Sequence, residues 1–433
     1  MDSRATNSPA GRWTIVRRIV GLPLSRRGTL LRVICVAAAV ALAAGVVMLR
    51  FSGNGSFVTL GPMACSHELG QTATLLSDGR VLILGGTDLG SNEACQAEIY
   101  DPKTGNFVEA GSTQAASSYH SAILLSDGSV FIVGSDYTAL YDPKTGAFTD
   151  SPSAVGTSPR RVTPLSDGRV FVQEYNGKSG EATGWEWCKY VGGTNTGCTA
   201  EYVPTGEAWV EGQVFDPVSG AYGSSGRMNT ARSHYTTTLL ADGRVLIAGG
   251  LDDNKFQHEG EDALDSAELF DPTTGKFTET GRMITARSYH TATLLADGRV
   301  LITGGRLGLA GTAGSDELDS AEIYDPKTGA FTPTGSMFNT NSGHTATLLA
   351  DGRVLVFGYD AETYDPKTGK FTRTGPVIPV PIITSGNAVI ARTNHTATLL
   401  ADGRVLIVGG TVMDVAGAPD ASSTTRSAEL FQP

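Results

Sequence analysis

From residue 55 onwards, hydrophobic and polar residues alternate in short runs separated by turn signals. One stretch, from His290 to Gly305, reads His-Thr-Ala-Thr-Leu-Leu-Ala-Asp-Gly-Arg-Val-Leu-Ile-Thr-Gly-Gly. It predicts two strands joined by an Ala-Asp-Gly hairpin turn, because β-branched residues favour strands and glycine tolerates the positive φ of such turns. No window of this region keeps a helical period for more than a few residues. We therefore expect an all-β fold.

The same stretch recurs along the chain. Its central Asp-Gly pair begins at Asp78, Asp127, Asp167, Asp242, Asp297, Asp351 and Asp402. A second turn motif, Asp-Pro-x-Thr/Ser-Gly, follows the first six copies and begins at Asp101, Asp142, Asp216, Asp271, Asp325 and Asp365. Four short strands in a period of roughly 50 residues are the signature of a β-propeller blade.

The seventh period is incomplete. It stops at Ser427–Pro433, after its third strand, whereas Gly55–Met63 matches the fourth-strand sequence Gly275–Met283. A ring of sheets needs closing, because an open edge strand invites aggregation. We therefore predict seven blades, with an N-terminal strand completing the last one.

These repeats resemble kelch repeats, and most closely a bacterial branch similar to the central domain of galactose oxidase. The resemblance covers Ser56 to Pro433 and includes an aromatic residue before most Asp-Pro turns and an Arg-x-x-His that leads blades 5 and 7. It also includes Gly-Gly pairs at 85–86, 249–250, 304–305 and 409–410. Three blades depart from the pair, with Gly134-Ser135, Glu174-Tyr175 and Gly358-Tyr359.

The N-terminal 50 residues differ in character from the repeats. They hold eight arginines and one acidic residue, and Val33–Leu49 is an unbroken apolar run. At about 1.5 Å per residue this run spans roughly 26 Å, near the lower limit for crossing a bilayer. Arginines before such a segment predict a cytoplasmic N-terminus and an extracytoplasmic propeller.

We therefore expect a single-pass cell-membrane protein. Its expected parts are a basic cytoplasmic leader at 1–28, a transmembrane signal anchor at 29–50, a linker at 51–54 and the propeller at 55–433, with an insertion in blade 3 at 174–212. A cleaved export signal at Ala41–Ala43 is the alternative, and Ser25-Arg-Arg27 resembles a twin-arginine signal. Each interpretation exports the propeller.

Charge and cysteine content agree with export. The chain carries −11 and the leader +7, so the propeller carries about −18, which argues against nucleic acid as a partner. The four cysteines outside the apolar run predict disulfides, because export places them in an oxidising compartment. The topology favours the pairs Cys65–Cys95 and Cys188–Cys198. A metal site at these cysteines is disfavoured, because the paired Cys-x-x-Cys spacing is missing.

The first residue of each innermost strand forms a predicted ring. The ring consists of Gln71, His120, Arg160, Tyr235, His290, His344 and His395. The resemblance implies that histidines here bind copper, together with a tyrosine next to a histidine, an axial tyrosine and a tyrosine cross-linked to cysteine. Tyr119-His120 and Tyr289-His290 provide the dipeptide. We favour a structural role in which the histidines bond to neighbouring backbone, because histidine recurs in blades that cannot all be catalytic. We expect no metal or cofactor, with copper only for an oxidase.

Arginine and glutamate recur in the same way. Arg232, Arg287 and Arg392 lie three residues before the ring position. Glutamates recur in the third strand, at Glu98, Glu268, Glu322, Glu362 and Glu429. Such arginines can capture an acidic ligand, but we favour buried Arg–Glu pairs that hold neighbouring blades together, since a buried charge must be paired.

The blade 3 insertion is the favoured binding-site candidate. It contains Trp185, Trp187, Tyr190 and Trp209, beside the predicted Cys188–Cys198 loop. Aromatic side chains on such a loop suit sugar stacking or a protein contact. The alternative is a small satellite core that covers blade 3.

The loops between the second and third strands and those between blades share one face of a propeller, which we call the loop-bearing face. We expect a membrane-anchored binding module that takes a protein or glycan on this face, at the tryptophans or at His120, His290, His344 and His395. No nucleophile–base motif, phosphate loop or cofactor fingerprint is present, so no catalytic residue is assigned. The alternatives are enzymes on the same fold. One is a copper-radical oxidase resembling galactose oxidase, and the other is a sugar mutarotase.

Overall fold

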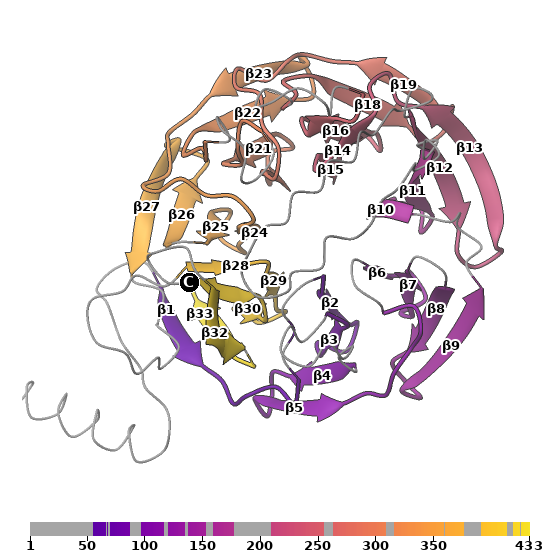
Figure 1. The fold of residues 1–433 in the computed structure, drawn as a ribbon, viewed down its shortest axis with the longest axis vertical. Coiled ribbons are helices and arrows are strands. Elements are labelled where there is room, and N and C mark those ends of the chain that lie inside the picture. The colour runs from indigo at the N-terminus through magenta and orange to yellow at the C-terminus, as the bar shows by residue number, and fades with distance from the viewer. Residues whose placement is uncertain are drawn as a thin grey trace, which may run out of the picture. The chain divides into compact units, whose positions relative to one another are not determined.

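The computed structural model describes most of the chain from residue 55 onwards. The described residues are 55–65, 67, 70–86, 97–116, 120–134, 137–152, 159–176, 209–254, 263–308, 316–358, 360–375, 391–413, 419–424 and 426–433. Every named element among them is a β-strand, and seven four-stranded sheets surround a common axis (Figure 1). The prediction of an all-β, seven-bladed propeller is confirmed. The predicted membrane anchor lies outside these ranges, and within them no helix is long and apolar enough to cross a bilayer.

Each blade is an antiparallel meander whose first strand lies nearest the axis (Figure 1). Blade 1 has β2 Thr72–Leu75, β3 Val81–Leu84, β4 Glu98–Asp101 and β5 Asn106–Glu109. Blade 2 has β6 Ser121–Leu124, β7 Val130–Val133, β8 Tyr137–Asp142 and β9 Ala147–Pro152. Blade 3 has β10 Pro159–Pro164, β11 Val170–Asn176, β12 Trp209–Asp216 and β13 Ala221–Arg227. Blade 4 has β15 Thr236–Leu239, β16 Val245–Ala248, β18 Ala267–Asp271 and β19 Lys276–Glu279.

The remaining blades repeat this order. Blade 5 has β20 Thr291–Leu294, β21 Val300–Thr303, β22 Ala321–Asp325 and β23 Ala330–Pro333. Blade 6 has β24 Thr345–Leu348, β25 Val354–Phe357, β26 Ala361–Asp365 and β27 Lys370–Gly375. Blade 7 has β29 Thr396–Leu399, β30 Val405–Val408, β33 Ala428–Gln432 and β1 Ser56–Thr59. Two smaller sheets, on the loop-bearing face, contain β14 Arg232–Ser233 and β17 Leu251–Asp252, and β28 Ala391–Thr393, β31 Thr411–Met413 and β32 Pro419–Thr424.

The N-terminal strand closes the ring, as predicted. Strand β1 pairs antiparallel with β33, with Ser56 opposite Gln432 and Thr59 opposite Glu429. The Phe57 ring lies 5.1 Å from the Phe431 ring, so the closure buries aromatic surface as well as backbone hydrogen bonds.

The two turn motifs end the strands through hydrogen bonds to aspartate and through glycines with positive φ. At the first turn, the Asp297 carboxylate accepts hydrogen bonds from the backbone and side chain of Arg299, and Gly298 has a φ of 87°. At the second turn, Asp325 accepts a hydrogen bond from the Lys327 amide at 2.9 Å. Such Asx contacts satisfy backbone donors that the sheet cannot. Both turns lie at the end of the blade opposite the loops.

The core lies between the blades. The second strand of most blades is buried along its length, as in Val300–Thr303, because a neighbouring blade covers each face. Phe171 of blade 3 stacks on Phe270 of blade 4 at 4.2 Å. Burial on both faces explains why these strands read as continuous apolar runs rather than alternating ones.

Blade 3 is more regular than its sequence suggests. Strand β11 continues to Asn176, which pairs with Trp209 at the start of β12. The expected insertion at 174–212 therefore begins and ends inside paired strands. Glycines with positive φ end the equivalent strand in blades 1, 4, 5 and 7, as at Gly304, and blade 3 has Glu174 there.

Candidate functional site

The ring histidines connect neighbouring blades. Each Nε2 atom lies at hydrogen-bond distance from a threonine hydroxyl in the preceding blade. The pairs are Thr72–His120 at 2.8 Å, Thr236–His290 at 2.9 Å, Thr291–His344 at 3.0 Å and Thr345–His395 at 2.8 Å. We expected a structural role with backbone partners. The structure shows threonine hydroxyls at Nε2, so each histidine joins two blades, and His395 also has backbone hydrogen bonds with Arg392 and Phe357.

The Gly-Gly pair makes room for these histidines. A Cβ atom on Gly304 would lie 2.8 Å from His344 Cε1 and 2.4 Å from the Asn341 carbonyl oxygen. Gly249 faces His290 in the same way, at 2.8 Å. The two motifs of the repeat are therefore one packing unit that spans two blades.

Burial keeps two of the histidines uncharged. Burial, together with the charge of Arg287, lowers the pKa of His344 to about 4. Burial, with Arg392 and then His344, lowers the pKa of His395 to about 3. Among the described residues, no three His, Cys, Asp or Glu side chains come together as a metal site would require. The histidine ring therefore has the properties of a structural contact between neighbouring blades.

The recurring arginines are buried and paired, but within a blade. Arg232 Nη2 lies 2.8 Å from Glu268, and Arg287 Nη2 lies 2.7 Å from Glu322. Each glutamate also accepts hydrogen bonds from the connection that enters its blade, as Glu268 does from Asn229 at 2.8 Å. The expectation that these pairs join neighbouring blades is wrong, because each pair fastens the incoming connection to its own third strand.

A second ring lies one residue before the histidines, on the loop-bearing face. We call His234, Tyr289, Gly343 and Asn394 the axial ring. Their backbones form a chain from blade to blade: Tyr289 N donates to His234 O at 3.1 Å, Gly343 N to Tyr289 O at 3.4 Å and Asn394 N to Gly343 O at 3.4 Å. Gln71 Nε2 extends it by donating to Asn394 O at 2.7 Å.

Three members of the axial ring are strained. His234, Tyr289 and Asn394 have φ values of 52°, 53° and 58°, in the left-handed region that favours glycine. This conformation costs about 1–2 kcal/mol for each such residue, and strain of this kind clusters at binding and catalytic sites. His234 and Asn394 are exposed, and Tyr289 is half-buried. The fold thus presents these side chains at an energetic cost.

Tyr289 is the centre of a polar and aromatic cluster. Its ring stacks on His234 at 4.0 Å, and the Arg306 guanidinium lies 5.5 Å from the ring centre. Arg306 pairs with Glu317 at 2.8 Å, and Ser342 accepts from Arg306 and donates to Glu317. The Arg306 Nε–H is buried and has no hydrogen-bond partner among the described residues. The cluster combines a stacking surface with a charge pair that adds no net charge.

Most of this cluster was not predicted from the sequence. Tyr289 was singled out only as part of a dipeptide, and His234, Asn394 and Arg306 were passed over. The sequence does contain a signal for these residues. The ring position itself is mostly histidine, whereas the residue directly before it varies from blade to blade. A position that varies between structurally equivalent blades is free of the packing role and available for a ligand.

The tryptophan candidates lie largely outside the described residues. Trp185, Trp187 and Tyr190 are not among them, and Trp209 is placed only as the first residue of β12. Cys65 takes part in a disulfide bond, and Cys95, Cys188 and Cys198 lie outside the described ranges. The specific cysteine pairs therefore stay predictions.

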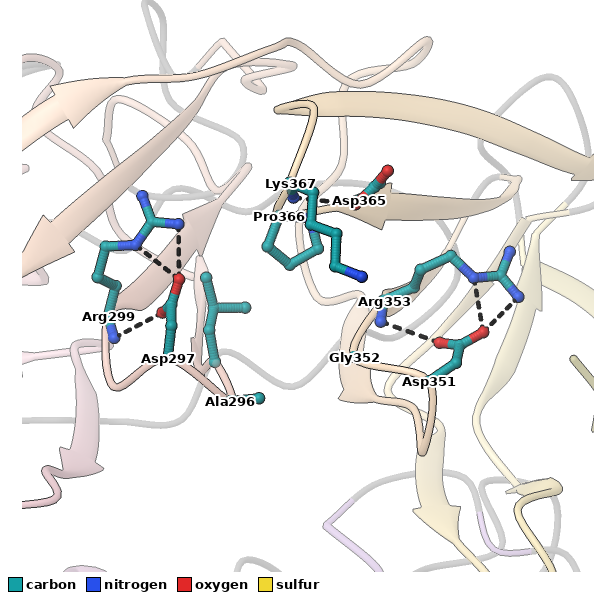
Figure 2. A pocket seen from close by; sticks show the side chains of 10 residues that line it. Ala296, Asp297, Arg299, Asp351, Gly352, Arg353, Asp365, Pro366 and Lys367 are labelled. Carbon is teal, nitrogen blue, oxygen red and sulfur yellow. Dashed lines mark hydrogen bonds and ion pairs between the residues drawn. The ribbon is translucent and has the colours of Figure 1, made fainter.

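Grooves are also present at the turn-bearing end, in the seams between blades. One of about 770 Å³ lies between blades 5 and 6 (Figure 2). Figure 2 shows that Asp297 holds Arg299 and Asp351 holds Arg353, each on its own turn, with Lys367 between the two pairs. Equivalent residues line a groove of about 620 Å³ between blades 4 and 5. Because the lining residues belong to the repeat itself, these grooves are features of the seams.

Comparison with known proteins places this geometry in context. A family model described as Kelch motif matches residues 287–338. Two galactose oxidases of Gibberella zeae, one from strain PH-1, are each 24% identical over 294 residues, which is 64% of this chain and 40% of each relative. The chain thus matches well under half the length of these relatives.

The fold is also similar to that of a solved enzyme. A fungal alcohol oxidase of the AA5 family, solved in complex with copper, aligns with a TM-score of 0.60 and 18% identity. The alignment covers 88% of this chain and 77% of that enzyme. At this identity the likeness concerns the fold.

Proposed function

Because this chain is a kelch-repeat β-propeller, we propose that it is a carbohydrate-active protein that takes a neutral, hydroxyl-rich ligand at the axial ring. The observation that carries the proposal is the strained His234–Tyr289 stack with Arg306 beside it. Aromatic faces stack on the apolar faces of sugar rings, and precisely placed polar groups then fix orientation. Glu317 neutralises Arg306, so the cluster favours a neutral ligand over an acidic one.

The relatives favour an enzyme over a pure binding module. Both curated relatives are named galactose oxidase, and the solved neighbour is an alcohol oxidase. An alcohol or sugar hydroxyl is therefore the first reacting group to test. This reverses the order of our expectations, in which a protein- or glycan-binding module came first and an enzyme second.

Copper belongs to this proposal, because the solved neighbour contains it. The expectation that no cofactor is needed has no support from these relatives. The described residues do not, however, assemble a donor set for copper. The ring histidines place Nε2 on threonine hydroxyls, and Cys65 is already in a disulfide bond, so it cannot cross-link to a tyrosine. We derive no catalytic step through copper.

The test is a combined turnover and binding experiment on the full chain. Oxygen uptake is measured with D-galactose and a panel of neutral alcohols, before and after loading with copper, and sugar binding is measured by calorimetry. Copper-dependent uptake establishes an oxidase. Binding without uptake establishes a glycan-binding module, and anomer exchange followed by NMR would identify a mutarotase. Absence of binding and of turnover across the panel would reject the proposal.

The compartment is part of the same proposal. We propose that the propeller is extracytoplasmic and anchored through the apolar segment at 33–49. Non-reducing peptide mapping of protein from intact cells is expected to join Cys65 to Cys95 and Cys188 to Cys198. Free thiols at all four positions in freshly lysed cells would contradict export.

A further inference from the structure

Five blades carry a buried glutamate at the same position of the third strand. Four of these carboxylates contact a cationic or protonatable side chain: Glu98 with His67, Glu268 with Arg232, Glu322 with Arg287 and Glu429 with Arg392. The fifth, Glu362 of blade 6, is 0% exposed. Within the described part of the chain it has no ion-pair partner, and it accepts hydrogen bonds only from backbone amides. A buried charge without a counter-charge is strongly destabilising.

Blade 5 shows what normally fills this place. Arg287 Nη1 donates to the carbonyl oxygens of Gly304 at 2.7 Å and Ser320 at 3.1 Å. Its Nη2 donates to Glu322 at 2.7 Å and to the Ser320 hydroxyl at 3.2 Å. One guanidinium therefore satisfies two carbonyls, a hydroxyl and a carboxylate. Arg232 makes the same set of contacts in blade 4.

Blade 6 keeps the frame and lacks the guanidinium. Asn341 occupies the position of Arg287 in the repeat. Gly358 N donates to the Asp360 carbonyl at 3.1 Å, and the equivalent pair in blade 5 has the same distance. The carbonyl groups of Gly358 and Asp360 occupy the repeat positions of the two that arginine contacts in blade 5, although Gly358 lacks the positive φ of Gly304. Asn341 is too short to provide the donors of a guanidinium.

The remaining substitutions make this place richer in oxygen. The Asn341 Oδ1 atom lies against Gly358, since a Cβ atom there would come within 2.4 Å of it. Asp360 replaces the serine of blades 4 and 5, which adds a second carboxylate close to Glu362. Asn339 Nδ2 donates to the Asp360 carboxylate at 2.5 Å, and Arg373 compensates its charge only in part, from 3.7 Å and with a side chain that is 55% exposed. Blade 6 thus exchanges a positive side chain for neutral and negative oxygens.

We propose that blade 6 binds a hard metal cation in place of the missing guanidinium, with Ca²⁺ as the first candidate. Its ligands are the Glu362 carboxylate, the carbonyl oxygens of Gly358 and Asp360, and the Asn341 side-chain oxygen. Ca²⁺ accepts such mixtures of carboxylate, carbonyl and amide oxygens. The site differs from a cluster of three acidic or imidazole side chains, none of which occurs among the described residues. Its role is to stabilise the connection between blades 5 and 6, and it does not depend on the proposed function.

The test measures the melting temperature of the chelator-treated full chain with and without millimolar CaCl₂. Wild type is expected to melt several degrees higher with Ca²⁺, because a ligand that binds only the folded state stabilises it. Glu362→Gln keeps the hydrogen-bond acceptor and is expected to lose the response. Asn341→Arg restores the arrangement of blade 5 and is expected to melt higher without Ca²⁺ and to ignore it. Glu109→Gln, on an exposed outer strand, is the matched control and keeps the wild-type response.

Calorimetry with CaCl₂ gives the stoichiometry, which is expected to be one ion per chain at this site. A Ca²⁺ response that survives in both Glu362→Gln and Asn341→Arg would overturn the proposal, since the ion would then bind elsewhere. No response of wild type to Ca²⁺, Mg²⁺ or Na⁺ would overturn it as well, and would indicate that Glu362 is buried in its protonated form.

Discussion

At the scale of single residues, the repeat divides into positions that pack and positions that vary. His344 and Gly304 illustrate the first kind, since each shapes the space available to the other. Tyr289 and Asn394 illustrate the second, since they share one strained backbone position and differ in chemistry. The sequence allowed the packing role of the histidines to be predicted from their recurrence. The site residues were missed because their signal is variation, which becomes visible only after the blades are superposed.

Gly304→Ala tests the packing unit. The substitution forces a side chain into a left-handed conformation, with φ at 59°, and brings its Cβ within 2.4 Å of the Asn341 carbonyl. Strain and overpacking together are expected to cost about 3 kcal/mol in the free energy of unfolding, measured by denaturant titration. Gly298→Ala is the matched control, since it has a φ of 87° and open space around it. Equal losses in the two variants would mean that backbone strain alone matters and that the histidine contact does not.

The buried histidines make stability depend on pH. The folded-state pKa of His344 is about 4, below the ordinary value of 6.5, so the unfolded chain binds a proton more readily between these values. The contribution of the neutral His344 ring to the free energy of unfolding is therefore complete above pH 6.5 and is lost as the pH falls towards 4. The loss amounts to about 3 kcal/mol for this group. Denaturant titrations of wild type and His344→Gln at pH 7.5 and pH 4.5 isolate it, and an unchanged difference between the two proteins would contradict the burial of a neutral ring.

At the scale of elements, the turn motifs and strands were predictable because both motifs recur in a fixed order. In both motifs the aspartate accepts hydrogen bonds from backbone amides of the turn, and glycine or proline allows the chain to reverse direction. Blade 3 was not predictable in the same way. Its strands extend to Asn176 and from Trp209, because Glu174 and Tyr175 replace the glycines that end the equivalent strands. The recurring arginines do pair with the recurring glutamates, as expected. The pairs lie within a blade rather than between blades, because sequence spacing does not show which third strand a connection crosses.

Removal of residues 55–63 tests the closing strand. This deletion takes away β1, exposes the edge of β33 and uncovers Phe431. We expect soluble aggregates by light scattering and a lower melting temperature, because an unpaired, apolar edge strand pairs with other chains. Removal of residues 1–54 keeps β1 and is the matched control, which is expected to remain monomeric. A monomeric 55–63 deletion with normal melting would refute the closure.

At the scale of the whole molecule, the two faces of the propeller differ in how much their residues vary from blade to blade. The turn-bearing end repeats the same Asp–Arg pairs from seam to seam (Figure 2). The loop-bearing face is where the blades diverge, with Arg306 and Glu317 in blade 5 and Asn341 with Asp360 in blade 6. The sequence therefore predicted the scaffold, whereas ligand binding on the loop-bearing face stays a prediction. It did not predict the axial ring as a candidate site, because this ring is assembled from single residues about 50 positions apart.

The proposed ligand of the axial ring is neutral and rich in hydroxyl groups, and it binds through Tyr289. The most direct measurement is the affinity of the full chain for D-galactose and galactose-containing oligosaccharides by calorimetry, in wild type and Tyr289→Asn. Asparagine already occupies this conformation at Asn394, so the variant is expected to fold with an unchanged melting temperature. We predict at least a tenfold loss of affinity in Tyr289→Asn and none in the exposed control Val218→Asn. Wild-type affinity in Tyr289→Asn, with binding lost instead in Trp185→Ala and Trp187→Ala, would contradict the account and move the site to the blade 3 insertion.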